Sequence, residues 1–270
     1  MSKTDRFLGM KRQGRPIAVL TAYDSPTAKA EAEANVDIIL VGDSVGVNML
    51  GYASEREVTL ADMRHHIGAV RRGAPQVVII GDLPFGTYDE PNQAVATARE
   101  LVGAGADIVK FEGPRLDILK ALVAASFEVC CHLGLEPQNH IEKRVKGRSA
   151  QDAAKLLGDA IMLDRAGMAM LVLEMIPEEV AAEVTRRVSA PTIGIGAGRR
   201  TDGQVLVITD VLGFGSKNFR HNRRYQDVGQ LMAETARAYV GDVHSADFPR
   251  EENLVHMAND ELELFLGEKA

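Results

Sequence analysis

The chain has 270 residues, of which 46% are hydrophobic, and a formal net charge of −7. This composition allows a sizeable core, and the acidic balance argues against nucleic acid or an anionic membrane surface as a partner. No apolar run approaches the roughly 20 residues that cross a bilayer, and the first residues lack the apolar core of a signal peptide. The only cysteines, Cys130 and Cys131, are adjacent and cannot staple the fold, so we expect a cytoplasmic protein.

Short aliphatic runs alternate along the chain with stretches of helical spacing. Because the runs are almost continuously aliphatic, they are typical of parallel strands that are covered on both faces. The expected strands are residues 17–24, 37–44, 77–84, 107–113, 127–134, 170–176, 191–198 and 205–213. The expected helices between them are residues 61–73, 91–106, 115–126, 150–168 and 177–188, and the acidic stretch 258–270 also has helical spacing.

The repeated strand–helix units, with no linker between them, predict a single α/β domain over residues 1–270. We expect a closed (β/α)8 TIM barrel, for which this length is ordinary. An open doubly wound sheet is the alternative. The barrel core is expected at about residues 15–240 and a C-terminal helical tail at about 241–270.

Polar and ionisable residues stand where the expected strands end. In a parallel barrel these ends open onto one face, where catalytic groups are found. We therefore expect one pocket to be lined by the residues at these ends, which are Asp24, Asp43, Ser44, Asp82, Lys110, Glu112, His132 and Glu174.

Asp43 and Asp82 each follow a glycine after an aliphatic run. Two carboxylates that converge on one pocket repel each other unless a cation or a proton lies between them. Their oxygens suit a hard ion such as Mg2+, which takes one or two protein carboxylates and keeps several waters. The alternative is that each aspartate caps the helix or loop that follows it.

The other ionisable residues also allow two interpretations each. Lys110 and Glu112 point the same way from one strand, either as a local ion pair or as an anion-binding lysine beside a carboxylate that holds the waters of a metal. Glu174 ends an apolar run, where partial desolvation suits a general base, although it could also pair with an arginine. His132 lies in an apolar setting, where histidine is more often a core residue than a catalyst.

Two further features carry weaker signals. The glycine-rich stretch 194–203 could cradle a phosphate, but it lacks the spacing of a dinucleotide site, and tight turns explain it equally well. Basic residues gather at 143–148 and 217–224, where they are either solvated loop charge or an attraction for an anionic cosubstrate.

Several motifs together resemble the ketopantoate hydroxymethyltransferase family. In the order of that family they are LTAYDSPTAK, VGDSVGVNMLGY, GDLPFGTY, AGADIVKFEG, HLGLEPQ, LVLEMIP and PTIGIGAGRRTDG, and the resemblance covers about residues 15–215. It implies a (β/α)8 barrel of the phosphoenolpyruvate mutase/isocitrate lyase group, with a small-molecule 2-oxo acid and folate as partners. It also implies a homo-oligomer, in the family a homodecamer.

The resemblance further implies hydroxymethyl transfer from 5,10-methylenetetrahydrofolate to 3-methyl-2-oxobutanoate, giving 2-dehydropantoate for pantothenate and coenzyme A biosynthesis. It implies one Mg2+ per subunit, which would stabilise an enolate of the keto acid. By resemblance, Asp43 and Asp82 are the metal ligands and Glu112 contacts the ion through water. Glu174 is the general base, and the keto acid is bound by Ser44, Lys110 and His132 together with Asp43 and Asp82.

The chain departs from the family pattern at three places. A Gly-Gly-Tyr is missing from the loop at 139–148, Thr209 stands where the family commonly has histidine, and residues 219–225 differ from the usual basic segment. These changes leave open a Mg2+-dependent lyase or aldolase that acts on another 2-oxo acid. A third hypothesis is a non-catalytic assembly protein, which the intact ionisable residues disfavour.

Overall fold

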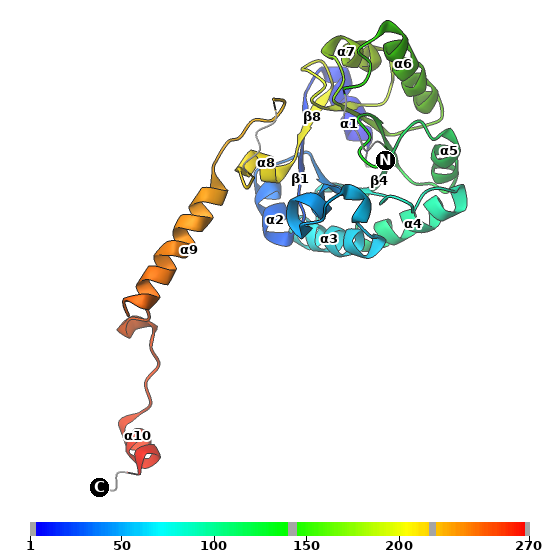
Figure 1. Ribbon diagram of the computed structural model, residues 1–270. Coiled ribbons are helices and arrows are strands. Elements are labelled where there is room, and N and C mark those ends of the chain that lie inside the picture. Colours follow the sequence, from blue (N-terminus) through cyan, green and yellow to red (C-terminus); the bar gives the residue numbers. More distant parts are fainter. Residues whose placement is uncertain (1–3, 140–144, 216–219, 268–270) are drawn as a thin grey trace.

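The computed structural model describes residues 4–139, 145–215 and 220–267, and its strands form a closed parallel barrel in sequence order (Figure 1). This confirms the (β/α)8 barrel and excludes the open sheet. The strands are β1 (Ile17–Thr21), β2 (Ile38–Val41), β3 (Val78–Asp82), β4 (Ile108–Glu112), β5 (Val129–Gly134), β6 (Met170–Glu174), β7 (Thr192–Ile195) and β8 (Gly203–Leu206).

Helices surround the barrel, and the five helices expected between strands are confirmed as α3 to α7. The layer consists of α2 (Ser25–Glu33), α3 (Leu60–Gly73), α4 (Pro91–Ala104), α5 (Leu116–Ala124), α6 (Ala150–Arg165), α7 (Glu178–Arg187) and α8 (Ile208–Leu212). Short helical turns lie at η1 (Gly46–Leu50), η2 (Glu55–Glu57) and η3 (Glu251–Asn253).

Two apolar layers make up the core. One lies between the strands and the helices and includes Ile39, Ile67 and Leu101. The other fills the barrel interior with the inward-facing residues of each strand, such as Ile38 and Ile80. Helix α1 (Asp5–Gln13), which the sequence analysis did not predict, adds buried Phe7 and Met10 to the interior layer and closes the N-terminal end of the barrel.

The eighth strand was predicted at the wrong position. It covers Gly203–Leu206 rather than 205–213, and Ile208–Leu212 form helix α8. A side chain on Gly203 would collide with the carbonyl oxygen of Ile17, so only glycine allows the strand to pair this closely with β1. The strand ends where the N–H of Ile208 donates to Thr21 Oγ1 at 3.0 Å and the chain turns into the helix.

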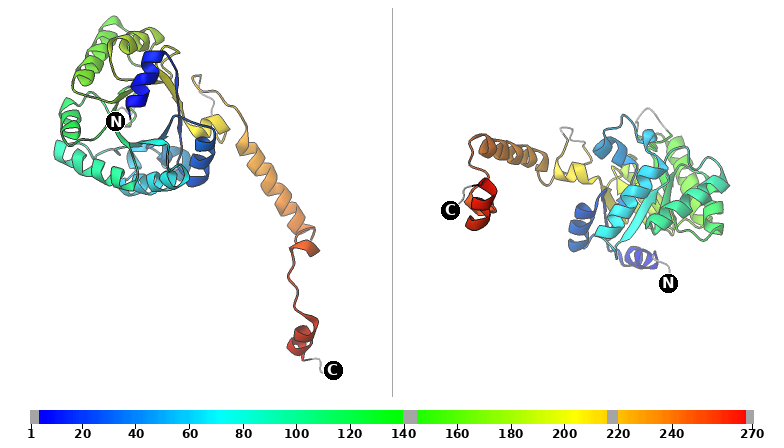
Figure 2. Two further views of the ribbon diagram at one scale, coloured as in Figure 1. Left: turned by 180° about the vertical axis from the view of Figure 1, so that it is seen from behind. Right: turned by 90° about the horizontal axis from the view of Figure 1, so that it is seen from below.

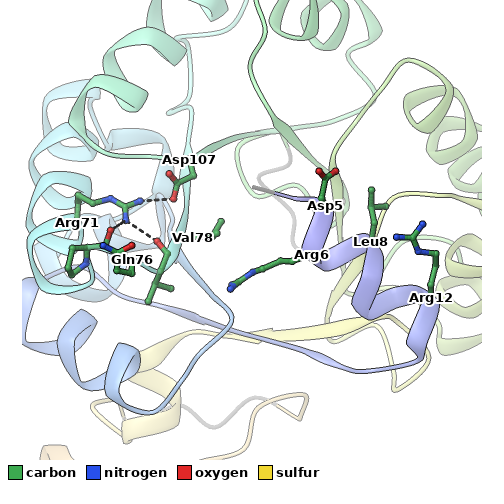
Figure 3. A pocket seen from close by; sticks show the side chains of 10 residues that line it. Asp5, Arg6, Leu8, Arg12, Arg71, Gln76, Val78 and Asp107 are labelled. Carbon is green, nitrogen blue, oxygen red and sulfur yellow. Dashed lines mark hydrogen bonds and ion pairs between the residues drawn. The ribbon is translucent and has the colours of Figure 1, made fainter. Parts of the chain in front are cut away.

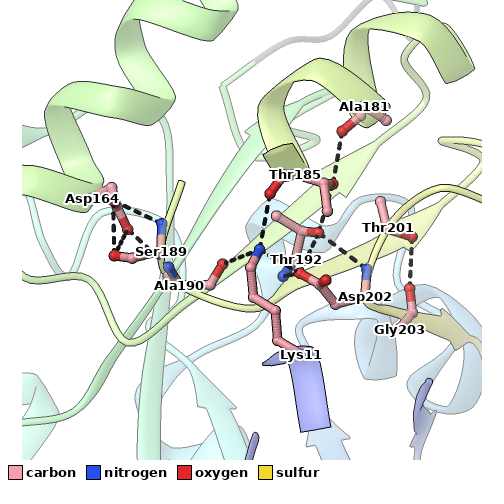
Figure 4. A network of polar contacts seen from close by, with 10 residues as sticks. All are labelled: Lys11, Asp164, Ala181, Thr185, Ser189, Ala190, Thr192, Thr201, Asp202 and Gly203. Carbon is pink, nitrogen blue, oxygen red and sulfur yellow. Dashed lines mark hydrogen bonds and ion pairs between the residues drawn. The ribbon is translucent and has the colours of Figure 1, made fainter. Parts of the chain in front are cut away.

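Two polar networks hold the N-terminal end of the barrel together. Lys11 Nζ lies 2.7 Å from Asp202 Oδ2 and donates to two backbone carbonyls, while the same Asp202 oxygen accepts from the N–H and the hydroxyl of Thr192 (Figure 4). Arg71 donates to Asp107 and to the carbonyls of Ala74, Pro75, Val77 and Gly105. A cavity of about 750 Å³ lies beside Arg71, between α1 and the start of β3 (Figure 3).

The C-terminal segment leaves the barrel. Helices α9 (Val228–His244) and α10 (Asn259–Leu266) project away from it in every view (Figures 1 and 2). Residue 240, our expected boundary between barrel core and tail, falls inside α9. None of the helices in the described part of the chain has the length and hydrophobicity that a membrane span requires. The basic runs 143–148 and 217–224 lie partly outside the described residues.

Candidate active site

A pocket of about 410 Å³ opens at the C-terminal end of the barrel. The structure brings together there seven of the eight residues expected at strand ends, namely Asp43, Ser44, Asp82, Lys110, Glu112, His132 and Glu174. Asp24 is the exception, because its carboxylate accepts from the backbone N–H of Thr27 and caps helix α2.

The alternation of the strands explains how these side chains reach the pocket. Alternate residues of a strand face the barrel interior, so Val78 and Ile80 are followed inward by Asp82, and Met170 and Val172 by Glu174. Below the pocket the inward residues are apolar and fill the interior. The last one or two inward positions of four strands are polar, which turns the upper end of the same barrel into a charged site.

Strand register decides which of these groups become partners. Asp82 of β3 lies opposite Lys110 of β4, and Lys110 Nζ is 2.7 Å from Asp82 Oδ2. Lys110 therefore pairs closely with Asp82, rather than only with Glu112 in its own strand. Burial lowers the pKa of Lys110, but the carboxylates of Asp82, Asp43 and Glu112 outweigh this and hold it above its usual value. The lysine is thus a fixed positive charge at the base of the pocket.

The two aspartates share a buried position beside a single ammonium group among the described residues, that of Lys110. The backbone N–H of Asp43 lies 3.3 Å from Asp82 Oδ2, and both residues are almost fully buried. Burial raises the pKa of Asp43 well above its usual range, and the nearby Asp82 and Glu112 raise it further. Burial also raises the pKa of Asp82, although Lys110 opposes the change. Their ionised forms need a further cation.

His132 stands between two glutamates. Its Nδ1 is 3.3 Å from Glu112 Oε1, and its Nε2 is 3.1 Å from Glu174 Oε2. Burial alone would lower the pKa of His132, but the two carboxylates raise it to about 10. Burial raises the pKa of Glu112, yet His132 outweighs this and lowers it below the usual value. Glu174 therefore has a histidine as its partner, where an arginine was the alternative.

Three neutral residues of the site escaped the sequence analysis. The Tyr23 hydroxyl is 2.8 Å from Ser44 Oγ, and the amide of Gln138 donates to Asp43 Oδ2 at 2.7 Å. Tyr88 in turn bonds to Gln138. Tyr23 and Gln138 belong to motifs that carry the family resemblance, LTAYD and HLGLEPQ, but neutral residues in loops have no charge or periodicity to mark them.

The site has features that suit a divalent cation. Asp82 Oδ1 is buried and has no hydrogen-bond partner in the described part of the chain. Three carboxylates, those of Asp43, Asp82 and Glu112, share the base of the pocket with one ammonium group. The described residues include no ready-made cluster of three or more His, Cys, Asp or Glu ligands, and Mg2+ commonly needs only one or two carboxylates with waters. The donor set therefore fits Mg2+.

The glycine-rich stretch is explained by its turns. Gly196 and Gly198 have φ values of 61° and 79°, and a side chain on Gly198 would lie 2.5 Å from Glu178 Cβ. These left-handed positions and close approaches favour glycine without a phosphate ligand.

Comparison with known proteins agrees with the fold and the motifs. The ketopantoate hydroxymethyltransferase family profile matches residues 2–251. The chain is 41% identical to a 3-methyl-2-oxobutanoate hydroxymethyltransferase of Geobacillus sp. (strain WCH70), over 99% of each chain.

Two solved structures share the fold at low sequence identity. One is 2,3-dimethylmalate lyase, a member of the PEP mutase/isocitrate lyase superfamily, with a TM-score of 0.61, 14% identity and coverage of 99% of this chain and 96% of that one. The other is phosphonopyruvate hydrolase in complex with oxalate and Mg2+, with a TM-score of 0.62, 10% identity and the same two coverages. The match to the family profile and the full-length relative together show that this chain belongs to the ketopantoate hydroxymethyltransferase family.

Proposed function

We propose that this chain transfers a hydroxymethyl group from 5,10-methylenetetrahydrofolate to 3-methyl-2-oxobutanoate, giving 2-dehydropantoate for pantothenate biosynthesis. The observation that carries the proposal is two runs of close polar contacts that line one pocket. One runs from Glu174 through His132 to Glu112, and the other from Lys110 through Asp82 to Asp43. The substrate named for the relatives is a keto acid, which needs an anion site, a Lewis acid and a base, and these residues include a candidate for each.

The base of the pocket supplies the binding groups. Lys110 and the hydroxyl of Ser44 bind the carboxylate of the keto acid, with His132 beside them. Asp43 and Asp82 would hold one Mg2+ per subunit, with Glu112 fixing its water ligands. Bound there, Mg2+ supplies Lewis-acid stabilisation of the negative charge that develops on the ketone oxygen. The solved structure of phosphonopyruvate hydrolase holds Mg2+ together with oxalate, a dicarboxylate with oxygens on two adjacent carbons, as in a 2-oxo acid.

Glu174 is the residue placed to act as the base. Its side chain is 18% exposed, whereas those of Asp82 and Glu112 are 3% and 2% exposed, so among these strand-end carboxylates it is the one that reaches the open part of the pocket. Glu174 takes the proton from C3 of the keto acid, next to the ketone. Water first opens the methylene bridge, which leaves a hydroxymethyl group on one folate nitrogen and a proton on the other. C3 then bonds to the hydroxymethyl carbon as its remaining bond to nitrogen breaks, and the proton that Glu174 removed goes to that nitrogen. Tetrahydrofolate leaves.

Proton exchange at C3 tests this proposal. NMR in deuterated water should show exchange of 3-methyl-2-oxobutanoate by the full chain with Mg2+, and product only when methylenetetrahydrofolate is added. Glu174→Gln should still bind the keto acid but lose exchange by about 10²-fold or more. A matched control is Glu178→Gln, which removes an ion pair with Arg199 outside the pocket, where the contact is 2.8 Å.

Two results would contradict the proposal. Exchange at the normal rate in Glu174→Gln would remove Glu174 from the role of base. Carbon–carbon cleavage of a different 2-oxo acid, without exchange of 3-methyl-2-oxobutanoate, would establish the lyase or aldolase alternative instead.

We further propose that the chain works as a homo-oligomer, and by resemblance to the family as a homodecamer. Met232, Tyr239, Val240 and Val243 recur at helical spacing along α9, and all are exposed. On the barrel, Ala18 of β1 and its pairing partner Gln204 of β8 are both exposed. By contrast, every residue of β2, β3, β4 and β5 is buried. An apolar helix face that none of the described residues covers and an uncovered part of the barrel fit contact between copies. The two buried, free thiols fit a cytosolic location.

Light scattering on the full chain tests the assembly. Met232→Glu and Val243→Glu each place a charge on the apolar face of α9 and should lower the mass of the particle. Glu234→Lys, a charge change elsewhere on the same helix, serves as the control. A monomeric wild-type chain would contradict the proposal.

A further inference from the structure

We propose that Gln138 is a positioning residue for the metal site, and this inference rests on the proposed function. Gln138 follows β5 in the loop at residues 135–139 and is 1% exposed. Its contacts are with the ends of three other strand units, at Asp43, Leu83 and Glu112. Two of these residues are carboxylates that we assign to Mg2+. One neutral side chain therefore links loop β5–α6 to both of them.

The contacts of Gln138 use its side chain and its backbone separately. The side-chain Nε2 donates to Asp43 Oδ2 at 2.7 Å and to the carbonyl oxygen of Leu83 at 3.1 Å. The backbone N–H donates to Glu112 Oε2 at 2.9 Å. Hydrogen bonds to a carboxylate are stronger than neutral ones, above all where water is excluded. Asp43 and Glu112 each have one oxygen fixed by the same residue.

Tyr88 determines which way the amide of Gln138 faces. Its hydroxyl donates to Gln138 Oε1, and Tyr88 is itself buried against Phe111, with 6.0 Å between the ring centroids. In the reversed orientation the amide oxygen would face the Asp43 carboxylate and the Leu83 carbonyl, which are acceptors only. The surrounding groups therefore permit one orientation, with the donor toward the carboxylate.

The two aspartates are consequently held in different ways. Asp82 is paired with the ammonium group of Lys110 at 2.7 Å, which balances its charge. Asp43 is held by a neutral amide, which fixes its orientation but leaves its charge for a cation. Neutral donors that orient a metal ligand in this manner commonly change metal affinity about 10- to 100-fold when they are removed. Asp43 is thus the aspartate that no ammonium group contacts directly in the described residues, and Gln138 fixes its orientation.

Binding of Mn2+ to the full chain, followed by electron paramagnetic resonance without substrate, tests this role. Gln138→Met keeps the length of the side chain and the backbone N–H toward Glu112, but removes the amide. We expect its dissociation constant for Mn2+ to rise about 10- to 100-fold. Excess metal should restore most of the C3 exchange, which it would not do for a general loss of structure. Tyr88→Phe keeps Gln138 and removes only the group that orients it, so a rise of about 2- to 5-fold is expected.

Gln93→Met is the matched control, because Gln93 also makes two hydrogen bonds through its amide but lies in helix α4, outside the pocket. Its Mn2+ affinity should stay within about 2-fold of the wild type. If the wild type binds Mn2+ and Gln138→Met binds it with the same affinity, the role of Gln138 is wrong, while the proposed function is unaffected. If Gln138→Met does not fold, unchanged affinity in Tyr88→Phe overturns it. A wild-type chain that binds no Mn2+ would overturn the proposed function as well.

Discussion

The two ends of the barrel use polar groups in opposite ways. At the N-terminal end, Asp202 Oδ2 accepts from Lys11 and from both donors of Thr192, and Arg71 donates to Asp107 and to four backbone carbonyls. At the C-terminal end, buried carboxylates outnumber their cations, and Asp82 Oδ1 has no hydrogen-bond partner among the described residues. In barrels of this kind, one end commonly serves stability and the other serves chemistry. Here the difference is visible in how completely each polar group is paired.

The comparison also explains why cavity size is a poor guide to the site. The cavity at the N-terminal end is the larger of the two, at about 750 Å³ against 410 Å³. Arg71, which lines the larger cavity, already has internal partners: it donates to Asp107, as Figure 3 shows, and to the backbone carbonyls of Val77 and Gly105. In the smaller pocket, incompletely paired charge remains for a ligand.

The largest expected effect comes from removing charge at the C-terminal end. Asp43→Asn and Asp82→Asn should each lower turnover by about 10³-fold or more, because each removes one of the two carboxylates that we propose as metal ligands. The melting temperature of Asp43→Asn should not fall, since the change relieves repulsion between buried carboxylates. Asp82→Asn should also lose stability, because it leaves the buried ammonium group of Lys110 without its 2.7 Å partner. Steady-state kinetics and thermal unfolding of the same samples check both parts. Normal turnover in either variant, or a lower melting temperature in Asp43→Asn, would contradict the assignment.

The opposite result is expected at the N-terminal end. Lys11→Met leaves the carboxylate of Asp202, whose side chain is 13% exposed, without its ammonium partner. The free energy of unfolding should fall by about 2–3 kcal/mol, while kcat stays unchanged. Denaturant titration measures the first and the activity assay the second. Lys29→Met, which removes a 4.0 Å pair with about 70% exposure on both sides, is the control and should cost less than about 0.5 kcal/mol.

Glu31 shows what an unpaired carboxylate does outside the pocket. It is buried in α2, and neither of its oxygens has a hydrogen-bond partner within the described residues. Burial, and to a lesser extent Asp24, raises the pKa of Glu31 from 4.5 to about 8. Its contribution to stability is therefore fully present below about pH 4.5 and is lost as the pH rises through about 8.

Glu31→Gln should remove this dependence. The variant should be more stable than the wild type by on the order of 2 kcal/mol at pH 9, with little difference at pH 4.5. Denaturant titrations across this pH range measure the effect. Equal pH profiles for the two proteins would show that Glu31 has a partner in solution.

The smallest effect is expected from Tyr23→Phe. The change removes the hydroxyl that lies 2.8 Å from Ser44 Oγ but keeps the ring in the core. One neutral hydrogen bond is worth about 1 kcal/mol, so KM for the keto acid should rise about 5-fold. The value of kcat should change less, because Tyr23 only orients Ser44. A fall in kcat with KM unchanged would instead place the Tyr23–Ser44 pair in the chemical step.

The barrel could be predicted because its strands are continuously aliphatic and alternate with helical spacing along the chain. The pocket followed from the same pattern, since Asp82 and Glu174 extend the inward-facing positions of buried strands. Asp24 was placed in the pocket wrongly, because an aspartate after a strand also caps a helix, and only the structure shows its contact with Thr27.

Other parts of the molecule depend on contacts far apart in the sequence. Gln138 reaches Asp43 across 95 positions, and Lys11 reaches Asp202 across 191. Neither contact can be recognised from hydrophobic periodicity or from the residues next to it in the sequence. The position of β8 depends on how closely Gly203 approaches Ile17, which was equally invisible in the sequence.

The most direct test of the central claim follows C3 deuterium exchange of 3-methyl-2-oxobutanoate on the full chain, while Mg2+ is removed with a chelator and then restored. If Asp43 and Asp82 hold the ion that makes the C3 proton acidic, exchange falls to the uncatalysed rate on removal and returns as a single class of site fills. Exchange that continues at the original rate on the metal-free protein would contradict the account.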